Sequence, residues 1–156
     1  MILPDAEALA AFVADLRARG RRIVFTNGVF DLLHPGHVRY LQAARSHGDA
    51  LIVGVNADAS VRRNKGSDRP IQPERERAEI LAALACVDAV AMFDEDTPAD
   101  LIDRVQPDVL VKGADWPADG IVGRDVVERR GGVVIREPIE PGYSTSAMIE
   151  KVRSLE

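Results

Sequence analysis

The sequence predicts an α/β fold in which helices cover both faces of a five-stranded parallel sheet, giving a three-layer sandwich. Short apolar strands and amphipathic helices alternate along most of the 156 residues, as expected for β–α–β units with right-handed crossovers. Residues 50–55 read ALIVGV, and such an unbroken apolar strand is typical of a parallel sheet that is buried on both faces. The length suits one domain with a substantial core, so we expect residues 1–156 to form a single domain.

The expected elements follow from local signals. Apolar residues at helical spacing predict a packing helix over 5–19, within the N-terminal segment 1–20. Asn27-Gly28 is expected to end the first strand, and Pro35 suits the first position of the next helix, where its missing N–H loses no partner. The strands are expected at 22–26, 50–55, 87–93, 108–112 and 133–135, and helices are expected to follow from Pro35, Asn56, Pro73, Pro98, Gly123 and Ser144. In the last helix, Met148, Ile149 and Val152 are expected to face the core.

Composition excludes several classes of function. The formal net charge of −5 argues against a nucleic-acid surface. The single cysteine, Cys86, cannot form an internal disulfide, which fits a reducing compartment. The chain starts with no basic-then-apolar signal pattern, and no apolar run reaches membrane length. We therefore expect a cytoplasmic protein with neither a nucleic-acid nor a membrane partner. Basic residues are concentrated between Arg62 and Arg77, so binding of small anionic ligands remains possible.

The chain is organised around residues 26–37, which read TNGVFDLLHPGH. A strand, a glycine turn and a helix start follow one another here, so His34 is expected at the helix cap and His37 on the same side of the first turn. The free N–H groups of a first helical turn attract anions, and Gly36 has no side chain to keep a phosphate away. The residues alone leave three interpretations open: a phosphate site, an ordinary cap, or two metal ligands with no third ligand nearby.

The same stretch resembles the HxGH signature of the cytidylyltransferase-like nucleotidyltransferases. Further matches follow in the family's order, from VNADASVRRNKG and RPIQPERERAEIL through DEDTP and DVLVKGADW to GYSTSAMI. They cover nearly the whole chain from Arg21 onward. Within the family, the motifs are most similar to those of the bacterial adenylyltransferases that join ATP to D-glycero-β-D-manno-heptose 1-phosphate for lipopolysaccharide synthesis.

The resemblance carries expectations about fold, ligands and partners. It implies a Rossmann-like fold of the HUP class, ATP and a sugar 1-phosphate as substrates, and Mg²⁺ bound with ATP rather than at a protein metal site. In many bacteria this activity forms the C-terminal half of a bifunctional protein that also contains a sugar kinase. A separate heptose kinase is therefore expected in the pathway. Relatives are often dimers, so a homodimer is also an expectation.

The resemblance also assigns roles to matching residues. It makes His34, His37 and Lys65 catalytic: the histidines would bind phosphate oxygens in the transition state, and Lys65 would position the incoming phosphate. Arg77, expected on the polar side of its helix, would contact the departing pyrophosphate, although it could simply pair with Glu74 or Glu76. The full nucleotide-binding set is Thr26, Asn27, Gly28, Val29, Phe30, Gly36, Arg77, Lys112, Gly113, Gly142, Tyr143, Ser144, Thr145 and Ser146. Asp31, Asp115 and Trp116 would line the substrate pocket.

Two other functions remain as alternatives. One is a glycerol-3-phosphate cytidylyltransferase. Those relatives carry an arginine a few residues before Gly142, where this chain has Ile139-Glu140-Pro141, so the departure counts against that activity. The other is a catalytically silent nucleotide-binding module, which the intact His34, Gly36 and His37 argue against. No GxGxxG follows the first strand, which weakens a dinucleotide-binding interpretation.

Overall fold

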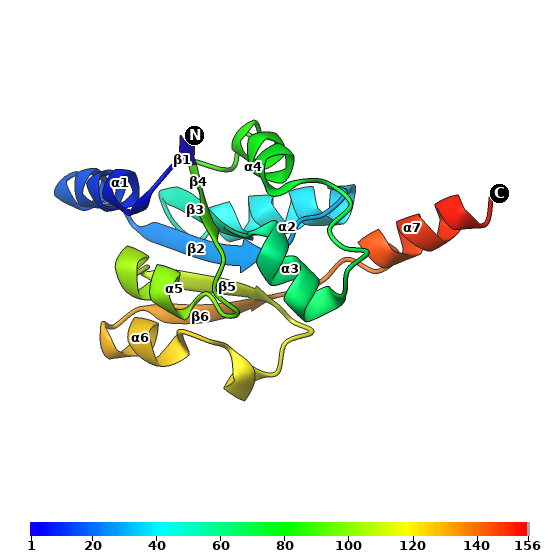
Figure 1. The fold of residues 1–156 in the computed structure, drawn as a ribbon. Coiled ribbons are helices and arrows are strands. Elements are labelled where there is room, and N and C mark those ends of the chain that lie inside the picture. Colours follow the sequence, from blue (N-terminus) through cyan, green and yellow to red (C-terminus); the bar gives the residue numbers. More distant parts are fainter. Residues whose placement is uncertain (156) are drawn as a thin grey trace.

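The computed structural model describes residues 1–155, which form a parallel sheet with helices on both faces (Figure 1). The six strands lie in the order β1-β4-β3-β2-β5-β6, and every neighbouring pair is parallel. Along the chain, β3 pairs with β2 and β4 then pairs with β3. The next strand, β5, pairs with β2 on its other side. The order therefore reverses between β2 and β5, where ligands bind in open α/β sheets. The strands are β1 (Ile2–Leu3), β2 (Ile23–Gly28), β3 (Ala50–Asn56), β4 (Ala89–Phe93), β5 (Val109–Gly113) and β6 (Val133–Glu137).

The helices form the two outer layers because alternate strand residues point to opposite faces. On one face Val24, Leu51 and Val53 pack with Leu41 of α2 and Leu81 of α4. On the other face Phe25, Ile52 and Leu110 pack with α1, α5 and α6. The helices are α1 (Ala6–Ala18), α2 (Pro35–Arg45), α3 (Asp58–Lys65), α4 (Glu74–Ala82), α5 (Ala99–Val105), α6 (Arg124–Arg129) and α7 (Thr145–Arg153), with a 3₁₀ turn at Ala118–Gly120. The predicted three-layer α/β class is confirmed.

The predicted number of strands is wrong by one. The sixth strand is β1, which adds to the edge of the sheet by pairing Ile2 with Val90 and Leu3 with Ala91. It was missed because two residues before a proline carry no alternation pattern. The first predicted strand also ends later than expected. Asn27 and Gly28 stay in β2, because they continue the ladder opposite Gly54 and Val55 of β3.

The last helix differs most from expectation. Ser144 caps α7 by accepting a hydrogen bond from the Ala147 N–H at 3.1 Å, as predicted. However, α7 contains no buried residue and extends away from the sheet (Figure 1). Met148 is 41% exposed and Val152 65% exposed, so the expectation that they face the core is wrong. Among the described residues, none of the helices combines the length and the apolar character needed to cross a membrane.

Candidate active site

The main cavity opens at the carboxyl ends of the central strands. Its volume is about 810 Å³, and its walls come from the β2–α2 segment, α3, the segments after β5 and β6, and the start of α7. Most residues that the sequence assigned to the site lie in this wall: Asn27, Gly28, Val29, Phe30, Asp31, His34, Gly36, His37, Lys65, Lys112, Gly113, Asp115, Trp116, Tyr143, Ser144, Thr145 and Ser146. Three assigned residues, Thr26, Arg77 and Gly142, are not in it.

The β2–α2 segment places the two histidines together. His34 is the N-cap of α2, and its Nδ1 accepts a hydrogen bond from the His37 backbone N–H at 3.3 Å. Pro35 takes the first helical position, as the sequence predicted. The two imidazole rings stack with centroids 3.7 Å apart and planes 14° apart. Because Nδ1 of His34 accepts, its proton is on Nε2.

Both imidazoles are neutral at physiological pH. Burial lowers the pKa of His34 below its ordinary value. Burial, together with the charge that His34 would carry when protonated, lowers the pKa of His37 to about 4. The His37 Nδ1 is itself buried and has no hydrogen-bond partner among the described residues. An unpartnered buried polar atom is uncommon in folded proteins, and a role in binding or catalysis is one explanation for it. The pair can therefore donate hydrogen bonds to an anion without adding a positive charge.

Gly36 allows the last loop to approach the histidines. A Cβ at Gly36 would lie 2.8 Å from the Cβ of Tyr143 and 3.1 Å from the His34 Nδ1. The 2.8 Å contact is shorter than real Cβ atoms make, so a larger residue at this position would push Tyr143 away. The start of α7 then lies against the start of α2, with the Thr145 hydroxyl donating to the Asp31 carbonyl at 2.7 Å. Two helix N-termini thus line one cavity, and both favour anions.

Asp31 lies in the cavity wall, but its carboxylate is already occupied. It accepts hydrogen bonds from the Ile71 N–H at 2.8 Å, the Gln72 N–H at 3.0 Å and the Arg69 Nε at 2.9 Å, and it is 2% exposed. Burial alone would raise the pKa of Asp31, but these hydrogen bonds outweigh it and hold the pKa below its ordinary value. Asp31 therefore fixes residues 69–72 against the β2–α2 segment.

Arg77 differs from its predicted position. The sequence placed it on the polar side of its helix, but the residue is 1% exposed. The prediction was wrong because its partners come from three separate segments that local spacing does not reveal. Its guanidinium donates to the carbonyls of Val29, Asn56 and Gln72 at 2.7–2.9 Å and to the Asp58 carboxylate at 2.7 Å. It therefore joins the segments that follow β2 and β3 to the segment before α4, behind the cavity wall.

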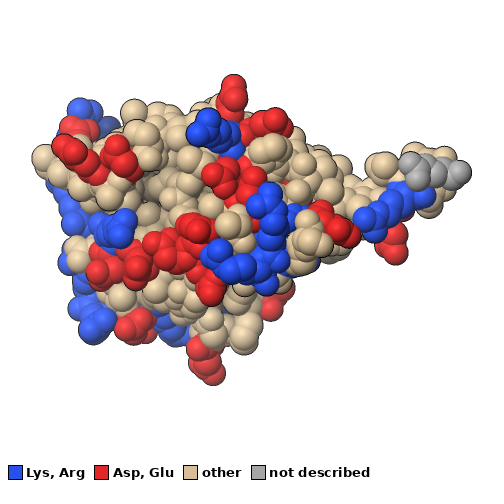
Figure 2. Space-filling model, viewed as in Figure 1, with Lys and Arg blue, Asp and Glu red and all other residues tan. Residues whose placement is uncertain are grey.

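Basic side chains gather over α3 and the loop after it, beside the cavity (Figure 2). They do not play the same part. Arg63 pairs with Asp94 and Asp96, and Arg69 pairs with Asp31. Lys65 is exposed at the end of α3, lines the cavity and forms no ion pair within the described chain. Its ammonium is thus available to an anion.

Lys112 approaches the cavity from the other side of β2, at the end of β5. It is 7% exposed, and its ammonium donates to the Asn27 Oδ1. The Nζ also lies 5.6 Å from the centre of the Trp116 ring. Burial lowers the pKa of Lys112 to about 8, although nearby Asp115 opposes the shift.

Several wall residues were not predicted from the sequence, among them Tyr40, Asn56, Arg69, Ile121 and Ile139. Two of them carried a usable signal. Tyr40 lies one turn after His37 on the same helix face. Asn56 is the polar end of a buried strand beside the switch point. Arg69 and the two isoleucines lie in loops, where spacing gives no information about direction.

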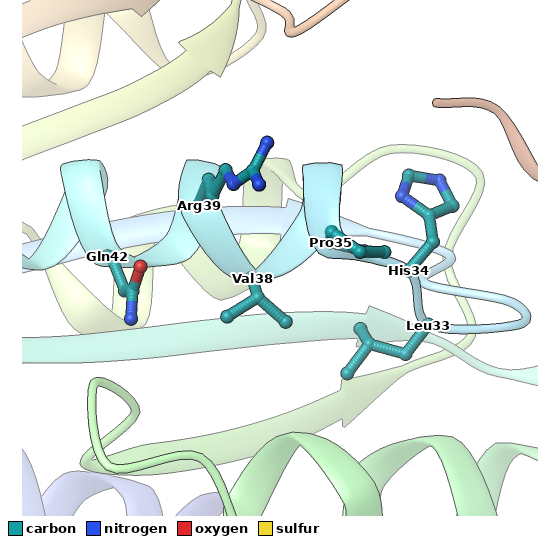
Figure 3. A pocket seen from close by; sticks show the side chains of 6 residues that line it. All are labelled: Leu33, His34, Pro35, Val38, Arg39 and Gln42. Atoms are coloured by element: carbon teal, nitrogen blue, oxygen red, sulfur yellow. The ribbon is translucent and has the colours of Figure 1, made fainter. Parts of the chain in front are cut away.

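A second, more open hollow of about 450 Å³ runs along α2. Figure 3 shows Leu33, Val38 and Gln42 pointing to one side of the helix, whereas His34 and Arg39 point to the other. Of its lining residues His34 and Arg39 are titratable, and His34 also lines the larger cavity. Most of the candidate site residues lie in the larger cavity.

Comparisons with known proteins identify relatives of this chain. The family model described as cytidylyltransferase-like matches residues 25–151. The chain is 57% identical over 152 residues to "Bifunctional protein HldE" of Geotalea uraniireducens strain Rf4, which covers 97% of this chain and 31% of that protein. It is 56% identical over 146 residues to the protein of the same name from Geobacter sulfurreducens, covering 94% and 30%. The chain thus spans about a third of the length of the curated relatives it matches.

Solved structures show the same fold. The lipopolysaccharide core biosynthesis protein from Thermoplasma volcanium GSS1 superposes with a TM-score of 0.64 and 30% identity, covering 78% of this chain and 98% of that one. A pantoate–β-alanine ligase from Francisella tularensis gives a TM-score of 0.63 at 17% identity, covering 99% and 77%. At that identity, the ligase supports the fold alone.

Proposed function

Because the chain belongs to the cytidylyltransferase-like family, we propose that it transfers the adenylyl group of ATP to D-glycero-β-D-manno-heptose 1-phosphate, giving ADP-heptose and pyrophosphate. The observation that carries the proposal is the stacked pair of neutral histidines at the start of α2, facing the start of α7 across Gly36. The similarity to HldE proteins and to a lipopolysaccharide core biosynthesis protein supports this acceptor.

The proposed reaction needs alignment and charge stabilisation more than proton transfer. An oxygen of the sugar phosphate attacks the α-phosphorus, the new P–O bond forms, and the bond to the bridging oxygen of pyrophosphate breaks. The attacking phosphate is already an anion near neutral pH, so no strong general base is required. His34 and His37 donate hydrogen bonds to oxygens of the α-phosphate as it becomes five-coordinate. Lys65 holds the incoming phosphate, and the N–H groups at the start of α7 hold the departing one.

We also propose that Mg²⁺ enters with ATP. Among residues 1–155, no group of three or more His, Cys, Asp or Glu side chains could hold a metal ion, and the Asp31 carboxylate is bound to protein donors. The ion would be held mainly by phosphate oxygens and would neutralise their charge, as is usual where the protein offers few ligands. We expect one domain acting in the cytoplasm, as a homodimer, on a sugar 1-phosphate supplied by a separate kinase.

Pyrophosphate release tests the proposed function. The protein is incubated with ATP or CTP and a panel of sugar phosphates that includes the heptose 1-phosphate and glycerol 3-phosphate. We expect release with ATP and the heptose 1-phosphate. Comparable or faster release with CTP and glycerol 3-phosphate would support the cytidylyltransferase alternative instead. Nucleotide binding without any release would identify a silent binding module.

Lys65→Ala is expected to lower turnover while leaving folding intact. Lys65 is exposed and unpaired within the described chain, and substitutions at such positions change stability by less than about 0.5 kcal/mol. The measurement is the steady-state rate at varied sugar phosphate, with a melting curve. Arg62→Ala, on the same helix but outside the cavity, is the matched control. A Lys65→Ala protein with parental kinetics for the sugar phosphate would remove Lys65 from the site.

A further inference from the structure

Lys112 is a buried ammonium with one hydrogen-bond partner among the described residues, Asn27. Of the lysines in the chain, Lys65 and Lys151 are exposed, whereas Lys112 is 7% exposed. Its one hydrogen bond goes to Asn27, and no carboxylate of the described residues lies within ion-pair distance. A lysine has three N–H donors and no acceptor. Burying a charge without a carboxylate is costly, so donors that remain free at a cavity wall favour an acceptor supplied by a ligand.

The two ends of the cavity differ in character. Lys65 and the basic side chains of α3 lie beyond β3, are exposed, and suit a hydrated sugar phosphate. The end beyond β5 instead contains Ile121, Ile139 and Trp116. The two histidines, which follow β2, lie between these ends because β2 is flanked by β3 and β5. Phosphates already have donors in the centre, so the ligand portion at the β5 end is better matched by a flat, largely apolar ring.

We propose that Lys112 is the base-reading residue of this site and donates a hydrogen bond to a ring nitrogen of adenine, which lies against Trp116. The inference rests on the proposed use of ATP but not on the transfer step. Adenine presents bare ring nitrogens that accept hydrogen bonds and a π face that can stack on an indole. Asn27 holds the ammonium in place from β2, which limits where the ring nitrogen can lie.

Affinity measurements test the assignment without requiring turnover, because with ATP alone no sugar phosphate is present to receive the adenylyl group. Lys112→Met should weaken ATP binding by about 10- to 100-fold, the loss expected for one hydrogen bond to a charged donor. Binding of inorganic tripolyphosphate should stay within about twofold, because the phosphates have other donors. Lys151→Met, at the exposed end of α7, is the control with the same change of charge and should bind ATP as the parent does. Removing a buried charge should leave the protein folded, which a melting curve checks.

Deaza analogues of ATP identify the accepted atom. Replacing N1, N3 or N7 of adenine by carbon removes one acceptor at a time. For the parent protein, the affinity for one of the three analogues should be at least about tenfold lower than the affinity for ATP. For Lys112→Met, the affinities for that analogue and for ATP should be equal. If all three analogues bind the parent like ATP, or if Lys112→Met loses tripolyphosphate affinity equally, Lys112 is a phosphate ligand and the proposal fails.

The pH dependence gives an independent readout. The charged and titratable groups on adjoining elements are Asp115 after β5, Arg136 and Glu137 on β6, and Tyr40 on α2. Burial lowers the pKa of Lys112 to about 8, so ATP affinity should fall as the pH rises through that value and the ammonium is lost. Lys112→Arg keeps its charge and should remove this dependence. A parent that binds ATP but transfers nothing would contradict only the proposed function, whereas a parent that does not bind ATP would contradict both.

Discussion

His37→Ala is expected to lower kcat by about 10²–10³-fold, the usual effect of removing one donor aimed at developing charge. In the proposed reaction, backbone N–H groups at the starts of α2 and α7 hold the ground-state phosphates, and the substitution leaves these groups in place. ATP affinity should therefore change only a few-fold. What is lost is a neutral donor directed at oxygens whose charge and position change during the reaction. The effect should appear in kcat more than in the nucleotide Kd.

The control for His37 is the remaining histidine. His47 pairs with Glu137 and does not line the cavity, so His47→Ala should turn over like the parent. His37→Asn should recover part of the rate, because an amide can still donate. A folded His37→Ala protein with a rate within a few-fold of the parent would refute the role of the histidine pair.

Arg77→Ala is expected to lower the free energy of unfolding by about 3–5 kcal/mol, because it leaves buried partners of a charged group without a donor. The guanidinium holds the Asp58 carboxylate and the carbonyls of Val29, Asn56 and Gln72. These groups belong to three separate segments of the chain, which Arg77 joins. A loss of this size is a large share of the stability of an ordinary domain.

Urea unfolding measures the effect. Arg75→Ala is the matched control, because Arg75 is exposed on the same helix and should change stability by less than about 0.5 kcal/mol. If Arg77→Ala unfolds like the parent but binds ATP weakly, then Arg77 contacts the nucleotide phosphates, as the resemblance implies. The structure favours the first outcome, since all of its nitrogens already donate to protein acceptors.

Much of the fold could be predicted because its signals are local. The buried strand at 50–55 and the cap at His34 each depend on a few adjacent residues. The alternation of strands and helices then fixed the class, and the switch point between β2 and β5 explains why distant motifs meet at one cavity. The edge strand β1 escaped prediction because its pairing partner lies almost ninety residues away, at Val90 and Ala91.

The site was less predictable where long-range partners decide a side chain's position. Asp31 was predicted to line the substrate pocket and does lie in the cavity wall, but the sequence did not reveal that its carboxylate holds residues 69–72. For Arg77, helical periodicity indicated a solvent-exposed side chain, but hydrogen bonds to buried acceptors hold it inside the protein. Lys112 was expected only as a nucleotide contact. Its burial depends on the pairing of β2 with β5, which the sequence does not reveal. Apart from the Gln72 carbonyl, which is close to Arg77 in the chain, the deciding atoms lie 19 or more residues away.

The exposed position of α7 has a consequence for access to the cavity. None of its residues is buried, and its first turn and the loop before it are held by contacts such as the Thr145–Asp31 hydrogen bond and the pairing of Arg39 with Glu140. Local opening that breaks these contacts leaves the hydrophobic core intact. The amide hydrogens of α7 should then exchange with solvent well before those of β2 and β3. The α7 wall of the cavity can thus open locally while the rest of the molecule stays folded.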